Sequence, residues 1–298
     1  MSSTGPGVRV FGTTFSNPVL LAAGTCGFGE PVIDVMTTDQ IGGLVTKSVT
    51  LEPRAGNAAP RVTEYGAGML NSVGLANPGL EAVRAEKLPW MRKALGSLPV
   101  FVSVAGHNVD EYVAVVRGLA DEDGFIGFEL NLSCPNDARL GGRPFSLDPA
   151  ALQAVLEAVR PLTDRPLLVK LAPNDPAIDE TAKLAEDLGV DGITAINTVP
   201  GLLVHAGGRP KLGAGPGGTS GPGIFPVGLA AVKKIVAAVS VPVLGVGGIV
   251  SGREARAYLE AGASLVQVGT GSFADPRCAA RVAQQVGQGP FAIDPSAA

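Results

Sequence analysis

The chain of 298 residues has only three cysteines, Cys26, Cys134 and Cys278, which lie far apart in the sequence. Such an odd, scattered set excludes a disulfide framework, and it offers no C-x-x-C spacing for a metal site. A reducing cytoplasm is therefore the expected compartment. The first ten residues have no apolar core of the kind that a signal peptide requires, so we expect no secretion.

The chain also has little charge. Charged residues make up 17% of it, the formal net charge is −4, and there is no basic tract. This excludes the electrostatic footprint of proteins that bind nucleic acid or acidic membrane surfaces. One uncharged run of membrane-like length, residues 235–252, contains Pro242 and four glycines. It predicts a helix end, a turn and a buried strand rather than a membrane span.

Glycine, by contrast, is abundant. The 41 glycines are about 14% of the chain, roughly twice the usual share. Glycine and proline together stay below the range that indicates low-complexity disorder, and 46% of the residues are hydrophobic. The composition predicts a well-buried globular protein that needs bare backbone at particular places.

Eight short apolar runs alternate with amphipathic, helix-length segments. Strands of a parallel sheet are buried on both faces and therefore read as continuous apolar runs. Eight such units favour a closed (β/α)8 TIM barrel over an open doubly wound sheet, and without a linker we expect one domain over residues 1–298. The predicted strands are Pro18–Gly24, Gly43–Ser48, Pro99–Ala105, Gly127–Cys134, Pro166–Leu171, Gly192–Thr198, Pro242–Gly247 and Leu265–Gly269. The clearest predicted helices are Asp148–Val159, Asp175–Leu188, Val227–Val239 and Gly252–Ala261.

Two connections, residues 49–79 and 199–225, are too long to be plain loops. Both follow the C-terminal end of a predicted strand, which is the face where barrel enzymes place their active sites. Long connections inside a compact domain are usually functional. We therefore expect both to extend over a site.

Polar side chains gather at the same strand ends. They comprise Lys47-Ser48, the stretch from Asn131 to Asn136, Lys170, and Asn197-Thr198. Unpaired polar groups are costly in such places, so a cluster of them indicates a site. Two lysines, several amides and the Cys134 thiol would converge there without a set of metal ligands.

The last two strands end in glycine instead, at Gly245–Gly248 and Gly269–Gly271. Bare backbone N–H groups next to a helix start are the usual phosphate site of this fold. The alternative is that these glycines only make tight turns. Because two such elements end neighbouring strands, the phosphate site is the favoured interpretation.

Each candidate side chain also has a plainer interpretation. Lys170 lies within an apolar run and needs an anionic partner, which a cofactor phosphate or ring would provide. Lys47 would alternatively pair with Glu129 or a loop acid. Cys134 taken alone would be a small buried hydrophobe, but its position on the active face favours a base. No carboxylate spacing suggests a triad for His107 or His205.

Together these motifs resemble the class 1 dihydroorotate dehydrogenases of pyrimidine biosynthesis. The likeness runs in order from about Phe11 to Ala280. Its motifs are Lys47-Ser48, Met69–Leu75, Asn131–Asn136, Ile196–Thr198, Gly218–Pro222, Gly247-Gly248 and Gly269-Thr270. Any one of them would be a weak signal, whereas the ordered set is specific.

The resemblance implies an FMN enzyme that oxidises (S)-dihydroorotate to orotate in UMP synthesis. Cys134 would be the general base that removes a proton from C5, a role that suits a thiol with an unperturbed pKa of about 8.5. Amide side chains, which both donate and accept, would match the edge of the ring. The implied substrate contacts are Lys47, Asn71, Ser72, Val73, Gly74, Leu75, Asn131, Asn136, Asn197 and Thr198. The implied FMN contacts are Ala23, Gly24, Lys47, Ser48, Ser103, Asn131, Lys170, Ile196, Gly221, Gly247, Gly248, Gly269 and Thr270.

The subclass decides the electron acceptor. The membrane-bound class has a serine at the position of Cys134, so this chain does not resemble that class. The motifs Thr50–Arg54 and Ile196–Thr198 resemble the NAD-linked cytosolic type. That type implies a homodimer at the centre of a heterotetramer, with FAD and a 2Fe-2S cluster on a partner subunit. Such a cluster takes four ligands, which three scattered cysteines cannot supply. The chain departs from the family pattern, in the FMN contacts, at Ala23, Ser103, Thr219 and Gly223.

Three alternatives stay open at this point. The first is a fumarate-linked enzyme with the same chemistry. The second is a flavin-free lyase or isomerase that uses the phosphate site, with Lys170 as a Schiff-base nucleophile. The third is a non-catalytic barrel that serves as a scaffold, which would leave the buried lysines unexplained.

Overall fold

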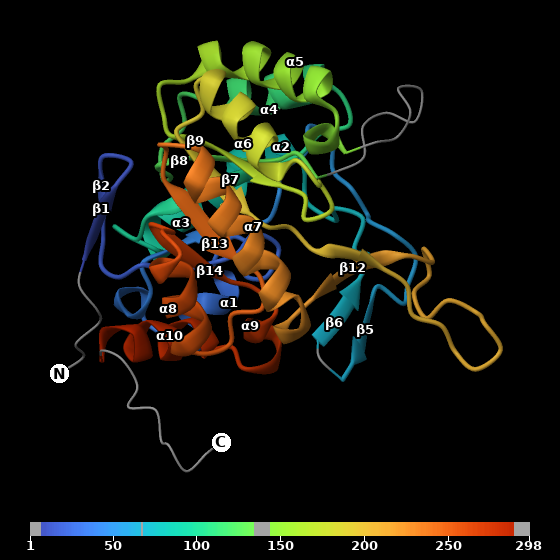
Figure 1. Cartoon of the computed structure of the whole chain (residues 1–298). Helices are drawn as coiled ribbons and strands as arrows, with labels where there is room; N and C mark the ends of the chain where they lie inside the picture. Colours follow the sequence, from blue (N-terminus) through green and yellow to red (C-terminus); the bar gives the residue numbers. More distant parts are fainter. Residues whose placement is uncertain (1–6, 67, 134–143, 289–298) are drawn as a thin grey trace.

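The computed structural model describes residues 7–66, 68–133 and 144–288, and its centre is a closed barrel of eight parallel strands (Figure 1). Neighbours follow one another in chain order around the barrel, which closes where β14 pairs with β3. The strands are β3 (Val19–Leu21), β4 (Gly43–Val45), β7 (Val100–Val104), β8 (Gly127–Asn131), β9 (Leu167–Leu171), β10 (Gly192–Ala195), β13 (Val243–Val246) and β14 (Leu265–Val268). Each coincides with one of the eight predicted runs, so the predicted barrel is confirmed.

Helices follow the strands and cover the outside of the barrel (Figure 1). They are α1 (Glu30–Ile33), α2 (Leu80–Ala82), α3 (Leu88–Ala94), α4 (Val109–Leu119), α5 (Pro149–Val159), α6 (Ile178–Asp187), α7 (Phe225–Ala238), α8 (Gly252–Glu260), α9 (Gly271–Ala274) and α10 (Cys278–Gly287). A π-helical turn over Val83–Lys87 joins α2 to α3. Among the residues that the structure describes, no helix is long and apolar enough to cross a membrane.

Polar side chains cap the N-terminal ends of two of these helices. The Asp148 carboxylate accepts hydrogen bonds from the backbone N–H groups of Ala150 and Ala151 at the start of α5. Ser251 and Glu254 form a reciprocal capping box at the start of α8. Each pair satisfies N–H groups that have no partner within the helix.

The barrel interior changes from apolar to polar along its length. Phe101, Leu168 and Leu265, on three different strands, pack in one buried cluster near the N-terminal end. A hairpin of β1 (Val8–Val10) and β2 (Thr13–Phe15) adds Phe15 to that cluster. Because alternate residues of a strand point inward, the next inward positions are Ser103, Lys170 and Gln267, all buried. Polar chemistry is therefore confined to the C-terminal end of the barrel.

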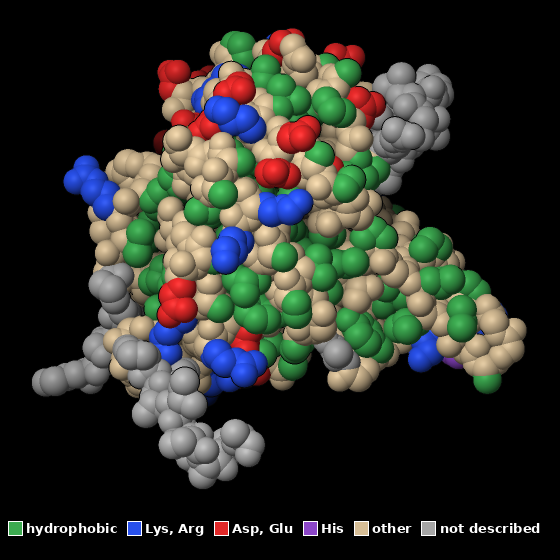
Figure 2. All heavy atoms as spheres, in the orientation of Figure 1, with side chains coloured by type: hydrophobic (Ala, Val, Ile, Leu, Met, Phe, Trp, Pro, Cys, Tyr) green, Lys and Arg blue, Asp and Glu red, His purple; other side chains and the backbone are tan. Residues whose placement is uncertain are grey.

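The two long connections form a second sheet of four antiparallel strands. It consists of β5 (Val62–Tyr65) and β6 (Gly68–Asn71) from the first connection, and β11 (Val199–Gly201) and β12 (Gly217–Ser220) from the second. β12 pairs with β6, so residues about 150 positions apart become neighbours. The sheet projects from the barrel, and in Figure 2 the charged side chains lie mainly over the helices, at α5 near the top and at α8 and α10 below, whereas few lie over the sheet. The two long connections are therefore not plain loops, because part of each forms strands of this sheet.

Candidate functional site

The amide side chains predicted at the strand ends meet at the C-terminal face of the barrel. Asn197 Nδ2, after β10, donates to Asn131 Oδ1 at the end of β8 over 3.2 Å. The backbone N–H of Thr198 donates to Asn197 Oδ1 over 2.8 Å, and the Tyr112 hydroxyl donates to the Asn131 carbonyl over 2.8 Å. Asn131, Asn197 and Thr198 are each partly exposed. The site therefore presents fixed donors and acceptors to solvent.

The small sheet brings Asn71 to this cluster. Asn71 Nδ2 donates to the carbonyl of Gly218, its partner across β6 and β12, over 3.1 Å. A Cβ atom at Gly218 would lie only 2.0 Å from Thr198 Oγ1. Glycine is therefore required where the second insertion passes the end of β10, and Asn71 is placed next to Thr198 through it.

Lys47, Ser48 and Ser103 occupy the adjacent strand ends. The hydroxyls of Ser48 and Ser103 are buried and lie 2.8 Å apart, and the Ser103 N–H donates to Thr46 Oγ1 over 3.1 Å. The ammonium of Lys47 lies 4.0 Å from the position that a Gly24 side chain would take, so it reaches across to the end of β3. The structure thus brings together the ends of β3, β4 and β7.

Lys170 has its anionic partner inside the barrel. Its ammonium lies 3.8 Å from Glu129 Oε1, and the two residues are 5% and 0% exposed. Glu129 Oε2 accepts hydrogen bonds from Thr194 Oγ1 at 2.8 Å and Gln267 Nε2 at 2.9 Å. The predicted need for an anion is confirmed, and a residue of the chain meets it. The sequence prediction did not include Thr194 and Gln267, although each is a polar residue inside a predicted apolar strand.

Glycines with left-handed backbone end β13 and precede α7. Gly247, Gly248 and Gly221 have φ values of 129°, 74° and 95°. A Cβ atom at Gly248 would lie 2.6 Å from the Cβ atom of Phe225, so a side chain has no room there. The Tyr258 hydroxyl donates to the Gly247 carbonyl over 2.8 Å and holds this turn in place.

The end of the neighbouring strand β14 is less crowded. A Cβ atom at Gly269 would make only ordinary contact, 3.5 Å from the Cβ atom of Ala22. Thr270 follows as the N-cap residue of the short helix α9. Because β13 and β14 are paired, their two glycine ends lie next to each other, as the sequence predicts.

Two predicted site residues, Cys134 and Asn136, lie outside the described residues. The preceding residue, Ser133, is described, and its hydroxyl donates to the Lys170 carbonyl over 3.4 Å. The other two thiols are buried, and burial raises the pKa of Cys26 to about 12 and also raises that of Cys278. Both are therefore neutral thiols near pH 7, in keeping with a structural role.

The histidines lie in loops, as predicted. The His107 ring contacts the Arg54 guanidinium, and His205 is exposed. Neither makes a contact with a carboxylate side chain through its ring in the hydrogen bonds found among the described residues. The structure gives no triad to either.

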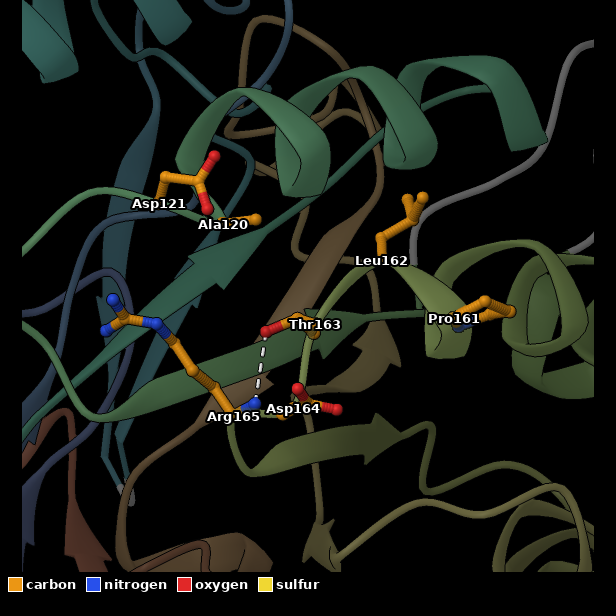
Figure 3. Close-up of a pocket in the computed structure, with 7 residues that line it drawn as sticks. All are labelled: Ala120, Asp121, Pro161, Leu162, Thr163, Asp164 and Arg165. Atoms are coloured by element: carbon orange, nitrogen blue, oxygen red, sulfur yellow. Dashed lines mark hydrogen bonds between the residues drawn. The ribbon is translucent and has the colours of Figure 1, made fainter.

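A hollow of about 430 Å³ lies at the opposite end of the barrel (Figure 3). It is lined by Ala120 and Asp121 after α4, and by residues 161–165 before β9. The Arg165 guanidinium stacks on the Phe125 ring at 4.4 Å and donates to two backbone carbonyls. The Arg165 guanidinium is thus already bound by the protein, and the polar strand ends lie at the other end of the barrel. This hollow is therefore not the candidate site.

Comparison with known proteins gives the same family throughout. The sequence model of the dihydroorotate dehydrogenase family matches residues 7–289. A Solibacter usitatus protein, provisionally named dihydroorotate dehydrogenase A (fumarate), is 46% identical over 94% of this chain and 91% of its own length. The catalytic subunits named dihydroorotate dehydrogenase B (NAD(+)) from Citrifermentans bemidjiense and Desulforudis audaxviator are 41% and 43% identical over 94% of this chain, and over 92% and 91% of their own lengths.

The buried ion pair gives a prediction for stability. Glu129→Ala should lower the free energy of unfolding by about 3–5 kcal/mol, because it leaves the Lys170 charge buried without its counter-ion. The double variant Glu129→Gln with Lys170→Met should recover most of that loss. Urea unfolding curves of protein freed of bound small molecules measure both values.

The exposed lysine Lys183, which pairs with Glu186 and Asp187, provides the control. Lys183→Ala should cost far less than Glu129→Ala, because water screens the charge of an exposed lysine. If the double variant is no more stable than Glu129→Ala, the pair does not account for the loss.

Proposed function

Because the chain belongs to the dihydroorotate dehydrogenase family, we propose that the strand-end cluster is the site where it oxidises (S)-dihydroorotate to orotate with FMN. The observation that carries this proposal is the contact of Asn131 with Asn197, joined by Thr198 and Asn71. A flat ring with alternating N–H and C=O groups needs both donors and acceptors at its edge, and amide side chains provide both. The substrate contacts predicted above include these four residues.

The residues present fit FMN at two points. At one, Gly221, Gly247 and Gly248 have positive φ values, and a side chain at Gly248 has no room, so bare backbone ends β13 and precedes α7, where this fold places a phosphate. At the other, Lys170 places a positive charge at the C-terminal end of the barrel, where it would suit the anionic edge of a reduced flavin. When bound, FMN supplies the acceptor for the hydride from C6 of the substrate.

The chain supplies the proton chemistry. We assign to Cys134 the removal of the C5 proton, which the thiolate takes onto its sulfur as the C5–C6 double bond of orotate forms. Asn71, Asn131 and Asn197 would hold the ring so that C5 faces this sulfur. The Ser133 bond to the Lys170 carbonyl supports the assignment, since it ties the residue before Cys134 to β9.

The acceptor we propose is NAD, reached through a partner subunit that carries FAD and a 2Fe-2S cluster, with this cytoplasmic single-domain chain as the homodimeric core of a heterotetramer. The names of the catalytic-subunit relatives and the motifs Thr50–Arg54 and Ile196–Thr198 favour this choice. The fumarate-linked type is the second candidate, because the relative at 46% identity carries that name.

An acceptor assay separates the two candidates. The chain purified alone should be yellow with bound FMN, and dihydroorotate should reduce artificial dyes but not NAD⁺ through it. Rapid turnover with fumarate would favour the second candidate instead. A colourless protein that takes up no FMN would contradict both, and co-purification from the source with iron and flavin analysis tests the partner.

The base is tested by substitution. Cys134→Ala should keep FMN and slow flavin reduction by dihydroorotate on the order of 10²-fold or more, the range for a lost general base. Stopped-flow absorbance measures this rate. Cys278→Ala, at a buried thiol on α10 that donates to the Val250 carbonyl, should leave the rate unchanged, and equal rates for both variants would remove Cys134 from the role.

The glycine turn is tested through Tyr258. Tyr258→Phe should weaken FMN binding by roughly two- to tenfold, since it removes a hydrogen bond of about 0.5–1.5 kcal/mol from the Gly247 carbonyl. Fluorescence titration of the apoprotein with FMN measures the affinity. Thr163→Val removes a hydroxyl hydrogen bond at the opposite end of the barrel, where Thr163 Oγ1 accepts from the Arg165 N–H at 3.1 Å, and it should leave FMN affinity unchanged. Equal losses of FMN affinity in both variants would contradict a role for the glycine turn.

A further inference from the structure

Residues 72–76, which follow β6, have no regular secondary structure. Four of them, Ser72 to Leu75, are predicted substrate contacts. Their backbone is also unusual, because Gly74 and Leu75 have φ values of 71° and 56°. The left-handed region is unfavourable for a residue with a Cβ atom, so Leu75 keeps this conformation only if the surroundings hold it.

The side chain that holds Leu75 is Asn77, which is nine-tenths buried. Asn77 Nδ2 donates to the Leu75 carbonyl at 2.7 Å and to Thr50 Oγ1 at 2.8 Å. Asn77 Oδ1 accepts from the backbone N–H groups of Gly79 at 2.9 Å and Thr50 at 3.2 Å. An amide has two donor hydrogens and two acceptor lone pairs, so every hydrogen-bonding position of this side chain is used.

Thr50 connects this clamp to the barrel. It is 3% exposed and follows Val49, which bridges to β7 at Val104. Its hydroxyl accepts from Asn77 and donates to the Glu52 carbonyl over 2.6 Å. Thr50 also lies two residues after Ser48. Through Asn77, the Leu75 backbone is thus tied to the same strand end that carries Lys47 and Ser48.

Other contacts hold the loop at its start. Asn57 Nδ2 donates to Ser72 Oγ at 2.8 Å, and the Asn57 N–H donates to the Val73 carbonyl at 3.0 Å. The backbones of Arg54 and Asn77 exchange two hydrogen bonds, at 2.9 and 3.1 Å. Asn57 is only half-buried and does not contact Leu75 in these bonds. The Leu75 carbonyl therefore depends on Asn77.

We propose that Asn77 is a positioning residue for substrate: it fixes the backbone of Gly74 and Leu75 against the end of β4 so that this loop closes over the orotate ring. The inference rests on the proposed function and on the predicted substrate contacts Ser72–Leu75. It assigns no role to Asn77 in FMN binding, because every contact of its side chain is with the loop, Thr50 or Gly79. An aspartate would keep both acceptor positions but lose both donors, and with them the bond to Leu75.

The test compares orotate and FMN binding in the FMN-loaded enzyme. Asn77→Asp should raise the Kd of orotate on the order of tenfold or more, as expected for the loss of two buried hydrogen bonds. The KM for dihydroorotate should rise with it, while FMN affinity should change less than about twofold. Titration of the flavin absorbance with orotate gives the first value, and release of FMN on dilution gives the second.

The matched control is Asn17→Asp. Asn17 is fully buried before β3, at the opposite end of the barrel, and its Oδ1 accepts from the Val19 N–H. This substitution should leave orotate binding unchanged. Equal weakening by both variants, or loss of FMN together with orotate affinity in Asn77→Asp, would assign Asn77 a merely structural role and overturn the proposal.

Thr50 provides a second route if Asn77→Asp does not fold. Thr50→Val removes the acceptor for Asn77 and should weaken orotate binding in the same direction, whereas Thr50→Ser keeps the hydroxyl and should restore it. Unchanged orotate affinity in Thr50→Val overturns the proposal. Failure of the unaltered enzyme to bind orotate at all would instead contradict the proposed function.

Discussion

One carboxylate inside the barrel constrains most of the candidate site. Glu129, on β8, faces Lys170 on β9 and accepts hydrogen bonds from Thr194 on β10 and Gln267 on β14. A buried charge is costly unless it is paired and hydrogen-bonded, so these four side chains determine one another's positions. Asn131 lies two residues beyond Glu129, and its place at the strand end follows from that arrangement.

The other half of the site depends on chain segments that the barrel does not contain. Asn71 arrives on β6 and is held by Gly218 of β12, so neither long connection can place its residues without the other. The close approach of Gly218 to Thr198 then sets this small sheet against β10. The barrel strands supply the buried charge and the glycine turns, and the paired insertions supply the part of the proposed site that would cover the substrate ring.

The sequence predicts the barrel well because its strands are short and apolar, and because residues such as Ser251 specify helix starts locally. It does not predict the small sheet, since the Gly217–Ser220 strand has little intrinsic preference for β-structure and forms through pairing with a distant segment. The partner of Lys170 depends on strand register, which periodicity alone does not supply. Asn77, in the turn sequence Asn-Pro-Gly, looks like an ordinary loop residue until its four hydrogen bonds are known.

Lys170 connects the two chemical tasks of the proposed reaction. Its ammonium, held by Glu129, is the positive charge that would face the anionic edge of a reduced flavin. Its backbone carbonyl accepts a hydrogen bond from the hydroxyl of Ser133, the residue that precedes the proposed base. A proton acceptor and a hydride acceptor must lie at fixed positions relative to C5 and C6 of one ring, because the reaction depends on near-contact geometry. In the proposed site the same residue of β9 would hold both, so a shift of that strand would displace them together and preserve their relative spacing.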